Sequence, residues 1–435
     1  MSTVVTVIGA GLAGCEVAWQ LAERKINVNL IEMKPAKRSP AHSSANFSEL
    51  VCSNSFRSND LTNAVGLLKE EMRRLNSVVI QSADETQIPA GGALAVDRER
   101  FAELITSKVK SHPYITVCEH EAIEIPEGKV IIATGPLTSD DFASCIAKLF
   151  PDKEMLSFFD AAAPIVATDS IDMNTAFFAS RYEKGDADYI NCPMDKDQYT
   201  AFYEALLSAE SAPVHGFEDK LVFEGCMPIE VMAKRGVDTM RYGPLKPVGL
   251  RDPRTGQDFY AVVQLRKDNT EGTIYNIVGF QTHLKFGEQK RVFSMIPGLE
   301  NADFVRYGVM HRNTYIDSPK LLDRYYRLRQ DIRISFAGQI TGVEGYVESA
   351  ASGLLCGIET ANEINGLSAI DFPAETAIGA LALYISAGSV SNFQPMNINF
   401  GIITPLDVKI KGKRNKNLAI SQRALEIIDT VTSSY

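Results

Sequence analysis

Three short runs of apolar and β-branched residues, widely separated along the chain, each lead into a glycine-bearing turn. The first, residues 4–8, is followed by Gly9-Ala10-Gly11-Leu12-Ala13-Gly14 and by a helical pattern. The second, residues 129–132, ends in Ala133-Thr134-Gly135. The third starts at residue 334 and leads into a turn and helix start that contain Gly338, Gln339, Glu344 and Gly345. A strand, a tight turn and a helix in this order are typical of parallel α/β folds.

The spacing of the first three glycines predicts a site for a dinucleotide. Gly9 permits the tight turn, Gly11 lets a pyrophosphate approach the backbone, and Gly14 lets the helix pack closely on the strand. The phosphates then lie at the positive helix N-terminus. A second apolar strand ends at Glu32, where a carboxylate can accept a hydrogen bond from ribose hydroxyls. An acidic residue at that place favours FAD or NAD over NADP.

The other two strand ends favour FAD, which is long enough to be held at both ends. Thr134 and Gly135 end a strand that is expected to run beside the cofactor. The segment from Gly338 to Gly345 is expected to bring a helix N-terminus to the flavin ring, whose reduced form carries negative charge. The alternative is that these are ordinary strand-to-helix turns without a ligand.

The middle of the chain has a different character. Alternating patterns predict strands over residues 260–265 and 273–278, a helix is expected from about Gln198 to Ser208, and Gly-Pro and Asp-Pro pairs mark the turns. We therefore predict an α/β protein: a discontinuous Rossmann-like FAD-binding domain, residues 1–165 and 325–435, with an inserted α+β domain, residues 166–324. The junction of such domains usually forms the substrate cleft.

Composition narrows the class of protein further. The chain has 435 residues, 45% of them hydrophobic, and no apolar run approaches the ~20 residues that span a bilayer. The N-terminus enters a strand directly, without a signal-peptide pattern, so we expect a cytoplasmic protein without a membrane partner. The net charge of −10 disfavours nonspecific binding to nucleic acid. Basic clusters at residues 285–291, 324–333 and 409–416 still permit an RNA partner.

The seven cysteines have no spacing typical of metal ligands, so we expect reduced thiols and no metal. Most lie in helical or strand-like patterns and are expected to be inert. Two differ. Cys52 lies in a polar stretch close to Arg57, and Cys226 lies between a glycine and a Met-Pro boundary. From spacing alone, either is a weak candidate for catalysis.

Motifs scattered over nearly the whole chain resemble those of the TrmFO family, the folate- and FAD-dependent tRNA uracil-C5 methyltransferases related to the flavoprotein MnmG. They are the opening glycine turn and residues 49–55 (ELVCSNS), 89–98 (PAGGALAVDR), 132–138 (IATGPLT), 189–194 (YINCPM), 224–228 (EGCMP), 278–285 (VGFQTHLK), 306–313 (RYGVMHRN) and 343–351 (VEGYVESAA). MnmG would also need a long C-terminal helical extension, so we expect a protein of the TrmFO type.

The resemblance implies transfer of the methylene carbon of 5,10-methylenetetrahydrofolate to C5 of the T-loop uridine of tRNA. FAD would supply the reducing equivalents, and NADH or NADPH would reduce FAD. A thiolate that adds to uracil C6 makes C5 nucleophilic, and a base must then remove the C5 proton. Cys52 and Cys226 match the family's catalytic positions. We assign Cys226 as the nucleophile and Cys52 as the base, with the exchanged roles left open.

The resemblance also suggests substrate contacts. His283 and Tyr346 are candidates to contact the pterin ring, and Lys285 and Arg312 are candidates to meet phosphate or the folate glutamate tail. Structural roles or surface ion pairs are the alternative for all four. Three other functions remain open: the same chemistry on ribosomal RNA, an FAD oxidoreductase of a small metabolite, and a noncatalytic RNA-binding flavoprotein. The sequence does not define an oligomeric state.

Overall fold

The computed structural model describes residues 3–39, 41–150, 155–161, 163–183, 186–212, 227–308, 310–388 and 393–432. Its first sheet has six strands, and the outermost pair is antiparallel whereas the other neighbours are parallel. The strand order is β16 (Arg327–Leu328), β17 (Asp331–Phe336), β7 (Lys129–Ile132), β1 (Val4–Ile8), β2 (Asn27–Glu32) and β6 (Ile115–Glu119). Strands from both ends of the chain thus form one sheet, which confirms the predicted fold class. The domain boundaries at residues 165 and 325 stay predictions.

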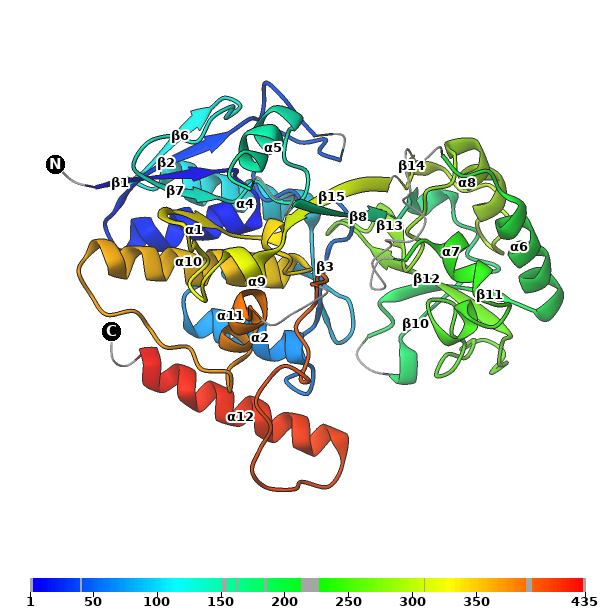
Figure 1. Cartoon of the computed structure of the whole chain (residues 1–435). Coiled ribbons are helices and arrows are strands. Elements are labelled where there is room, and N and C mark those ends of the chain that lie inside the picture. Colours follow the sequence, from blue (N-terminus) through cyan, green and yellow to red (C-terminus); the bar gives the residue numbers. More distant parts are fainter. Residues whose placement is uncertain are drawn as a thin grey trace.

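Two helices pack against each other beside this sheet, α1 (Leu12–Glu23) and α10 (Tyr346–Ile364) (Figure 1). Their backbones approach closely because glycines lie at the contact. A Cβ atom on Gly353 would lie 2.4 Å from the carbonyl oxygen of Ala13, and one on Gly357 would lie 2.8 Å from Cβ of Gln20. The small residues at this contact therefore let a helix from the first third of the chain pack closely against a helix from the last third.

Further elements complete this part of the molecule. They are α2 (Ala64–Arg74), α3 (Val78–Glu85), α4 (Arg98–Ser111), α5 (Asp140–Ala147), α9 (Ser318–Leu321), α11 (Ala377–Ser386) and α12 (Lys413–Thr432), with a small sheet of β3 (Ser55–Ser58), β5 (Ala93–Val96) and β4 (Gln87–Ile88). Among the described residues, no helix is both long and apolar enough to cross a membrane.

The second sheet also has six strands and lies apart from the first (Figure 1). Its order is β10 (Phe177–Ala179), β11 (Tyr189–Met194), β12 (Ala261–Lys267), β13 (Ile274–Ile277), β9 (Ile165–Ala167) and β14 (Phe304–Arg306). The helices α6 (Lys196–Ser208), α7 (Ile229–Lys234) and α8 (Phe286–Phe293) pack on it around a separate apolar core. A ribbon of β8 (Met155–Ala161) and β15 (Met310–Ile316) lies between the two parts. The predicted helix at 198–208 and both predicted strands are confirmed.

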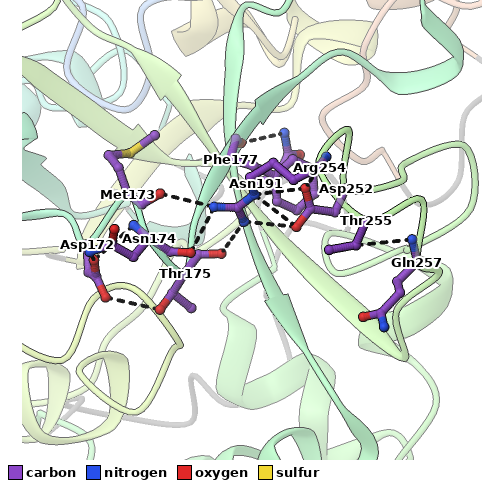
Figure 2. Close-up of polar contacts among 10 residues, drawn as sticks. All are labelled: Asp172, Met173, Asn174, Thr175, Phe177, Asn191, Asp252, Arg254, Thr255 and Gln257. Carbon is purple, nitrogen blue, oxygen red and sulfur yellow. Dashed lines mark hydrogen bonds and ion pairs between the residues drawn. The ribbon is translucent and has the colours of Figure 1, made fainter.

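A polar cluster around Arg254 fixes two loops of this second part (Figure 2). The Arg254 guanidinium binds both carboxylate oxygens of Asp252 at 2.9–3.2 Å. It also donates to the main-chain carbonyls of residues 173–175, at 2.8–3.3 Å. The hydrogen bond from Arg254 lowers the pKa of Asp252. Because one side chain serves four acceptor groups, the loop at 252–254 and the turn at 172–175 are held together.

A buried glutamate caps α11 and gives a testable pH dependence. Glu71 is fully buried, and its two oxygens accept hydrogen bonds from the main-chain N–H groups of Ala377 and Ile378 at 2.7 and 2.8 Å. Burial raises the pKa of Glu71 from 4.5 to about 8. The folded state therefore holds this proton at pH values where the unfolded chain has released it. Stability should fall as the pH rises from about 4.5 to 8.

Glu71→Gln cannot ionise, so we expect the melting temperature of this variant to depend less on pH across that window. Across this window the wild type should lose at most several kcal/mol of unfolding free energy relative to Glu71→Gln, on the order expected for such a pKa shift. Thermal melts between pH 5 and 8 would measure it, with the exposed Glu426→Gln as the control. Parallel pH curves for wild type and Glu71→Gln would contradict the prediction.

Candidate functional site

A cavity lies where the carboxyl ends of β1, β2, β7 and β17 meet, as expected for a ligand site in a parallel sheet. It encloses about 1100 Å³ of space not filled by protein atoms, part of it open to solvent. Ten residues predicted to bind cofactor or substrate line it: Gly9, Gly11, Leu12, Ala13, Glu32, Thr134, Gly135, Gly338, Gln339 and Tyr346. The fold thus brings the carboxyl ends of four strands, at residues 8, 32, 132 and 336, to the edge of this cavity.

The glycines of the first turn have the geometry that their spacing predicts. Gly9 has φ +99°, and a Cβ atom there would lie 2.7 Å from the carbonyl oxygen of Ala133. A Cβ atom on Gly14 would lie only 1.8 Å from the carbonyl oxygen of Gly9. At Gly11, which precedes α1, no protein atom lies within 4 Å of that position. An anionic group could therefore approach the backbone and the helix N-terminus, so this cradle fits the pyrophosphate of FAD.

Glu32 lies at the end of β2 and is 6% exposed. One carboxylate oxygen accepts from the N–H of Ala10 at 2.7 Å, and the other accepts from the N–H of Lys34 at 3.0 Å. These bonds fix the carboxylate at the cavity wall, and each oxygen retains a lone pair for another donor. The contact of Glu32 with a ribose stays a prediction.

The third glycine turn lies at the start of α10. Gly338, Gly342 and Gly345 all have positive φ, at +86°, +82° and +109°. Gln339 donates to Glu344 at 2.6 Å, which closes the turn. A Cβ atom on Gly338 would lie 2.9 Å from Cβ of Ala13, so this turn also packs against the first one. Ala10, Gly14, Glu344 and Gly345 support these turns but do not line the cavity.

Cys52 lies half-buried in a loop that Tyr346 holds. The phenol oxygen of Tyr346 accepts hydrogen bonds from the N–H groups of Cys52, at 2.8 Å, and Ser53, at 3.2 Å. Burial raises the pKa of Tyr346 well above its usual value, so the hydroxyl keeps its proton. The two N–H groups thus engage both lone pairs of the phenol oxygen. Tyr346 also lines the cavity, so it joins the cysteine loop to the cofactor site. Its contact with a pterin stays a prediction.

Three arginines surround this loop, and none was predicted. Arg98 donates to the carbonyl of Leu50 and forms an ion pair with Asp268, at 2.9 Å. Arg266, on β12 of the second sheet, binds Ser53 Oγ at 2.7 Å and Asn54 Oδ1 at 3.0 Å. Arg306, on β14, interacts electrostatically with Cys52 and Tyr346, as Arg98 does. Positive charge of this kind favours a thiolate.

His283 belongs to a buried pair in the second part. Its Nδ1 lies 2.5 Å from Oε1 of Glu230, on α7, and both side chains are at most 8% exposed. Glu230 also accepts from the main-chain N–H of His283 and from the hydroxyl of Thr282, each at 2.9 Å. Glu230 thus fixes the backbone of His283, and its carboxylate lies beside the ring.

The remaining candidates lie elsewhere. Lys285 pairs with Glu210 at 2.5 Å in an exposed position, as expected for a surface ion pair. Arg312 lies on β15, but its side chain is outside the described residues, and so is Cys226. The placement of the two predicted cysteines relative to each other is therefore not tested. Within the described part of the chain, no group of three or more His, Cys, Asp or Glu residues could hold a metal.

Comparisons with known proteins agree with this geometry. The sequence model of the family described as Glucose inhibited division protein A matches residues 4–368. A crystal structure of GidA from Aquifex aeolicus superposes with a TM-score of 0.70 over 98% of this chain and 73% of that chain, at 14% identity, and has the same fold. The family model, which covers most of the chain, thus places it in the GidA class, and the superposition shows the same fold.

Much closer relatives identify the family. The protein named Methylenetetrahydrofolate--tRNA-(uracil-5-)-methyltransferase TrmFO from Acetivibrio thermocellus is 60% identical over 436 residues, 100% of both chains. The protein of the same name from Listeria monocytogenes is 59% identical over 431 residues, 99% of both chains. The chain belongs to the TrmFO family.

If His283 contacts the folate, the charge of Glu230 should affect that contact. We expect Glu230→Gln to raise KM for methylenetetrahydrofolate by about tenfold, equivalent to about 1.4 kcal/mol, because the carboxylate charge beside the His283 ring is lost, with KM for RNA unchanged. Steady-state kinetics with each substrate varied would measure it. Glu204→Gln, at an exposed position on α6, should change neither constant. An unaltered folate KM in Glu230→Gln would argue against His283 at the folate site.

Proposed function

We propose that this protein transfers the methylene carbon of 5,10-methylenetetrahydrofolate to C5 of the T-loop uridine in tRNA. The observation that carries the proposal is 60% identity, over the full length of both chains, to a protein named for this methyl transfer to tRNA uracil. The glycine cradle, the fixed Glu32 carboxylate and the cavity support FAD as the bound cofactor. A tRNA substrate also places the enzyme in the cytoplasm.

The chemistry assigns distinct tasks to this chain. The methylene carbon must gain two electrons to become a methyl group, and bound FAD, reduced by NADH or NADPH, supplies them. A cysteine thiolate must add to uracil C6 so that C5 forms a bond to the carbon, and a base must then take the C5 proton. Cys52 lies in a loop held by Tyr346 and interacts electrostatically with Arg98 and Arg306, so it suits one of these two roles. Cys226 is proposed for the other.

A labelling experiment tests the proposal. Purified protein with bound FAD is incubated with a T-loop RNA, NADH and methylenetetrahydrofolate labelled in the methylene carbon, and the nucleosides are then analysed. We expect labelled 5-methyluridine. Reducible FAD without labelled 5-methyluridine would refute the proposal. A ribosomal RNA fragment in parallel distinguishes the RNA target.

A further inference from the structure

Three aromatic rings stack from the second core to the surface. Tyr307 stacks on Phe304, with centroids 5.5 Å apart and planes at 11°, and on Phe286, with centroids 5.2 Å apart and planes at 20°. Phe304 is 9% exposed, Tyr307 is half-buried, and Phe286 is 57% exposed. Phe286 thus presents an exposed aromatic face that is backed by two further rings, and such a face offers a surface for stacking with a planar ligand.

The stack is held rigidly. Phe286 is the first residue of α8, and Gln289, one turn later, is fully buried. Gln289 donates to the carbonyl of Gly308 and accepts from its N–H, both at 2.8 Å, and it also donates to the carbonyl of Leu284 at 2.7 Å. These bonds tie α8 to the segment that carries Tyr307. The exposed ring therefore loses little entropy when a ligand binds.

Basic side chains accompany the stack. Lys285 precedes Phe286, Lys290 lies four residues after it on the same face of α8, and Arg306 precedes Tyr307. Lys285 pairs with Glu210, and Arg291 pairs with Glu288, but Lys290 forms no ion pair with any described residue. An exposed aromatic ring beside lysine and arginine suits a nucleobase and its phosphate.

The position of the stack relates it to the cysteine loop. Arg306, next to Tyr307, reaches the carbonyl of Ala41 at 3.4 Å and interacts electrostatically with Cys52 and Tyr346. In Figure 1, β14 lies at the end of β15, and α8 lies beyond β14, on the side away from the first sheet. Tyr307 therefore directly follows a side chain that reaches the first part of the molecule, and this contact relates the stack to the candidate active site.

We propose that Phe286 and Tyr307 form a platform on which a base of the RNA substrate stacks, with Lys290 beside it for a phosphate. The inference rests on the proposed function and adds the place where RNA is held. A flanking base held at this platform would fix the orientation of the RNA relative to Cys52.

Binding of a fluorescent T-loop RNA, measured by anisotropy, tests the platform. We expect Phe286→Ala to raise Kd by about five- to hundredfold, the usual contribution of one stacked base, and Phe286→Trp to retain affinity. Phe178→Ala is the matched control and should bind like wild type, because this ring is 45% exposed but lies on β10, at the opposite edge of the second sheet from β14. Lys290→Ala should lower the slope of log Kd against log salt by about one, and Phe286→Ala should not change it.

The outcomes separate this inference from the proposed function. Wild-type affinity in Phe286→Ala, in an enzyme that methylates RNA, would refute the platform alone. A smaller oligomer in Phe286→Ala by light scattering, with RNA affinity unchanged, would identify the stack as a contact between copies of this chain and also refute it. A wild type that does not bind or methylate RNA would refute the proposed function and the platform with it. FAD reduction by NADH without RNA should be the same in all variants.

Discussion

Replacing Gly14 with alanine is expected to leave little folded protein and no bound FAD. The added Cβ atom would lie 1.8 Å from the carbonyl oxygen of Gly9, which belongs to the backbone. Gly9 cannot shift, because its N–H donates to the carbonyl of Ile31 at 2.8 Å and its own Cβ position faces Ala133. We expect a loss of at least ~3 kcal/mol of stability, the upper range for overpacking. Soluble yield, thermal melting and flavin absorbance would measure it.

Gly11→Ala is the matched control, because it should fail in a different way. No protein atom lies within 4 Å of its Cβ position, and its φ of −76° suits any residue. The apoprotein should therefore melt like wild type, while a methyl group in the cradle weakens FAD binding. If both variants lost the same apoprotein stability, Gly11 would be required for folding as Gly14 is, and the effect of Gly11→Ala could not be assigned to the cofactor.

The glycine turns could be predicted because their chemistry is local. A strand, its turn and the following helix lie within about a dozen residues, and parallel strands bring their carboxyl ends to one edge. The three turns at Gly9, Gly135 and Gly338 therefore indicated one cavity before any long-range contact was known. The same holds for the helix at 196–208, whose capping box between Asp195 and Gln198 is also local.

The surroundings of Cys52 could not be predicted in this way. The loop of Cys52 is held by the phenol oxygen of Tyr346, which lies 294 positions later in the chain. The next two residues, Ser53 and Asn54, are held by Arg266, which lies on the second sheet. Arg266 lies in an apolar strand pattern, where a single charge gives no indication of its partner. Arg98 and Arg306 each lie at one end of a motif that resembles the family, residues 89–98 and 306–313, and these motifs were the available sequence signal for the two arginines. Contacts at such separations depend on how the two sheets pack, which periodicity does not encode.

Tyr346 and His283 illustrate a second limit of predicting the site from sequence. The resemblance suggested both as pterin contacts, and the structure adds what holds each of them: two main-chain N–H groups at Tyr346 and a buried glutamate at His283. Residues that act on a substrate are usually fixed by such neighbours. Motifs identify the residue that touches the substrate more readily than the residue that positions it.

Cys52→Ala is expected to lower methyl transfer at least about a thousandfold, as the loss of a nucleophile or general base does. The alanine keeps the main-chain N–H that Tyr346 accepts, and Cys52 does not line the cofactor cavity. FAD content and FAD reduction by NADH should therefore match wild type. Cys118→Ala, at another half-buried cysteine, is the control and should retain transfer. Normal transfer in Cys52→Ala would exclude this thiol from the chemistry.

Covalent trapping then assigns the two thiols. An RNA with 5-fluorouracil at the target position blocks the final proton removal, so the cysteine that adds to C6 stays attached to the RNA. We expect Cys52→Ala to form this complex and Cys226→Ala not to form it, because Cys226 is proposed as the nucleophile. Gel mobility of the protein and RNA complex would measure it. Trapping that is lost only in Cys52→Ala would reverse the roles, and the arginines beside Cys52 would then stabilise the attacking thiolate rather than the base.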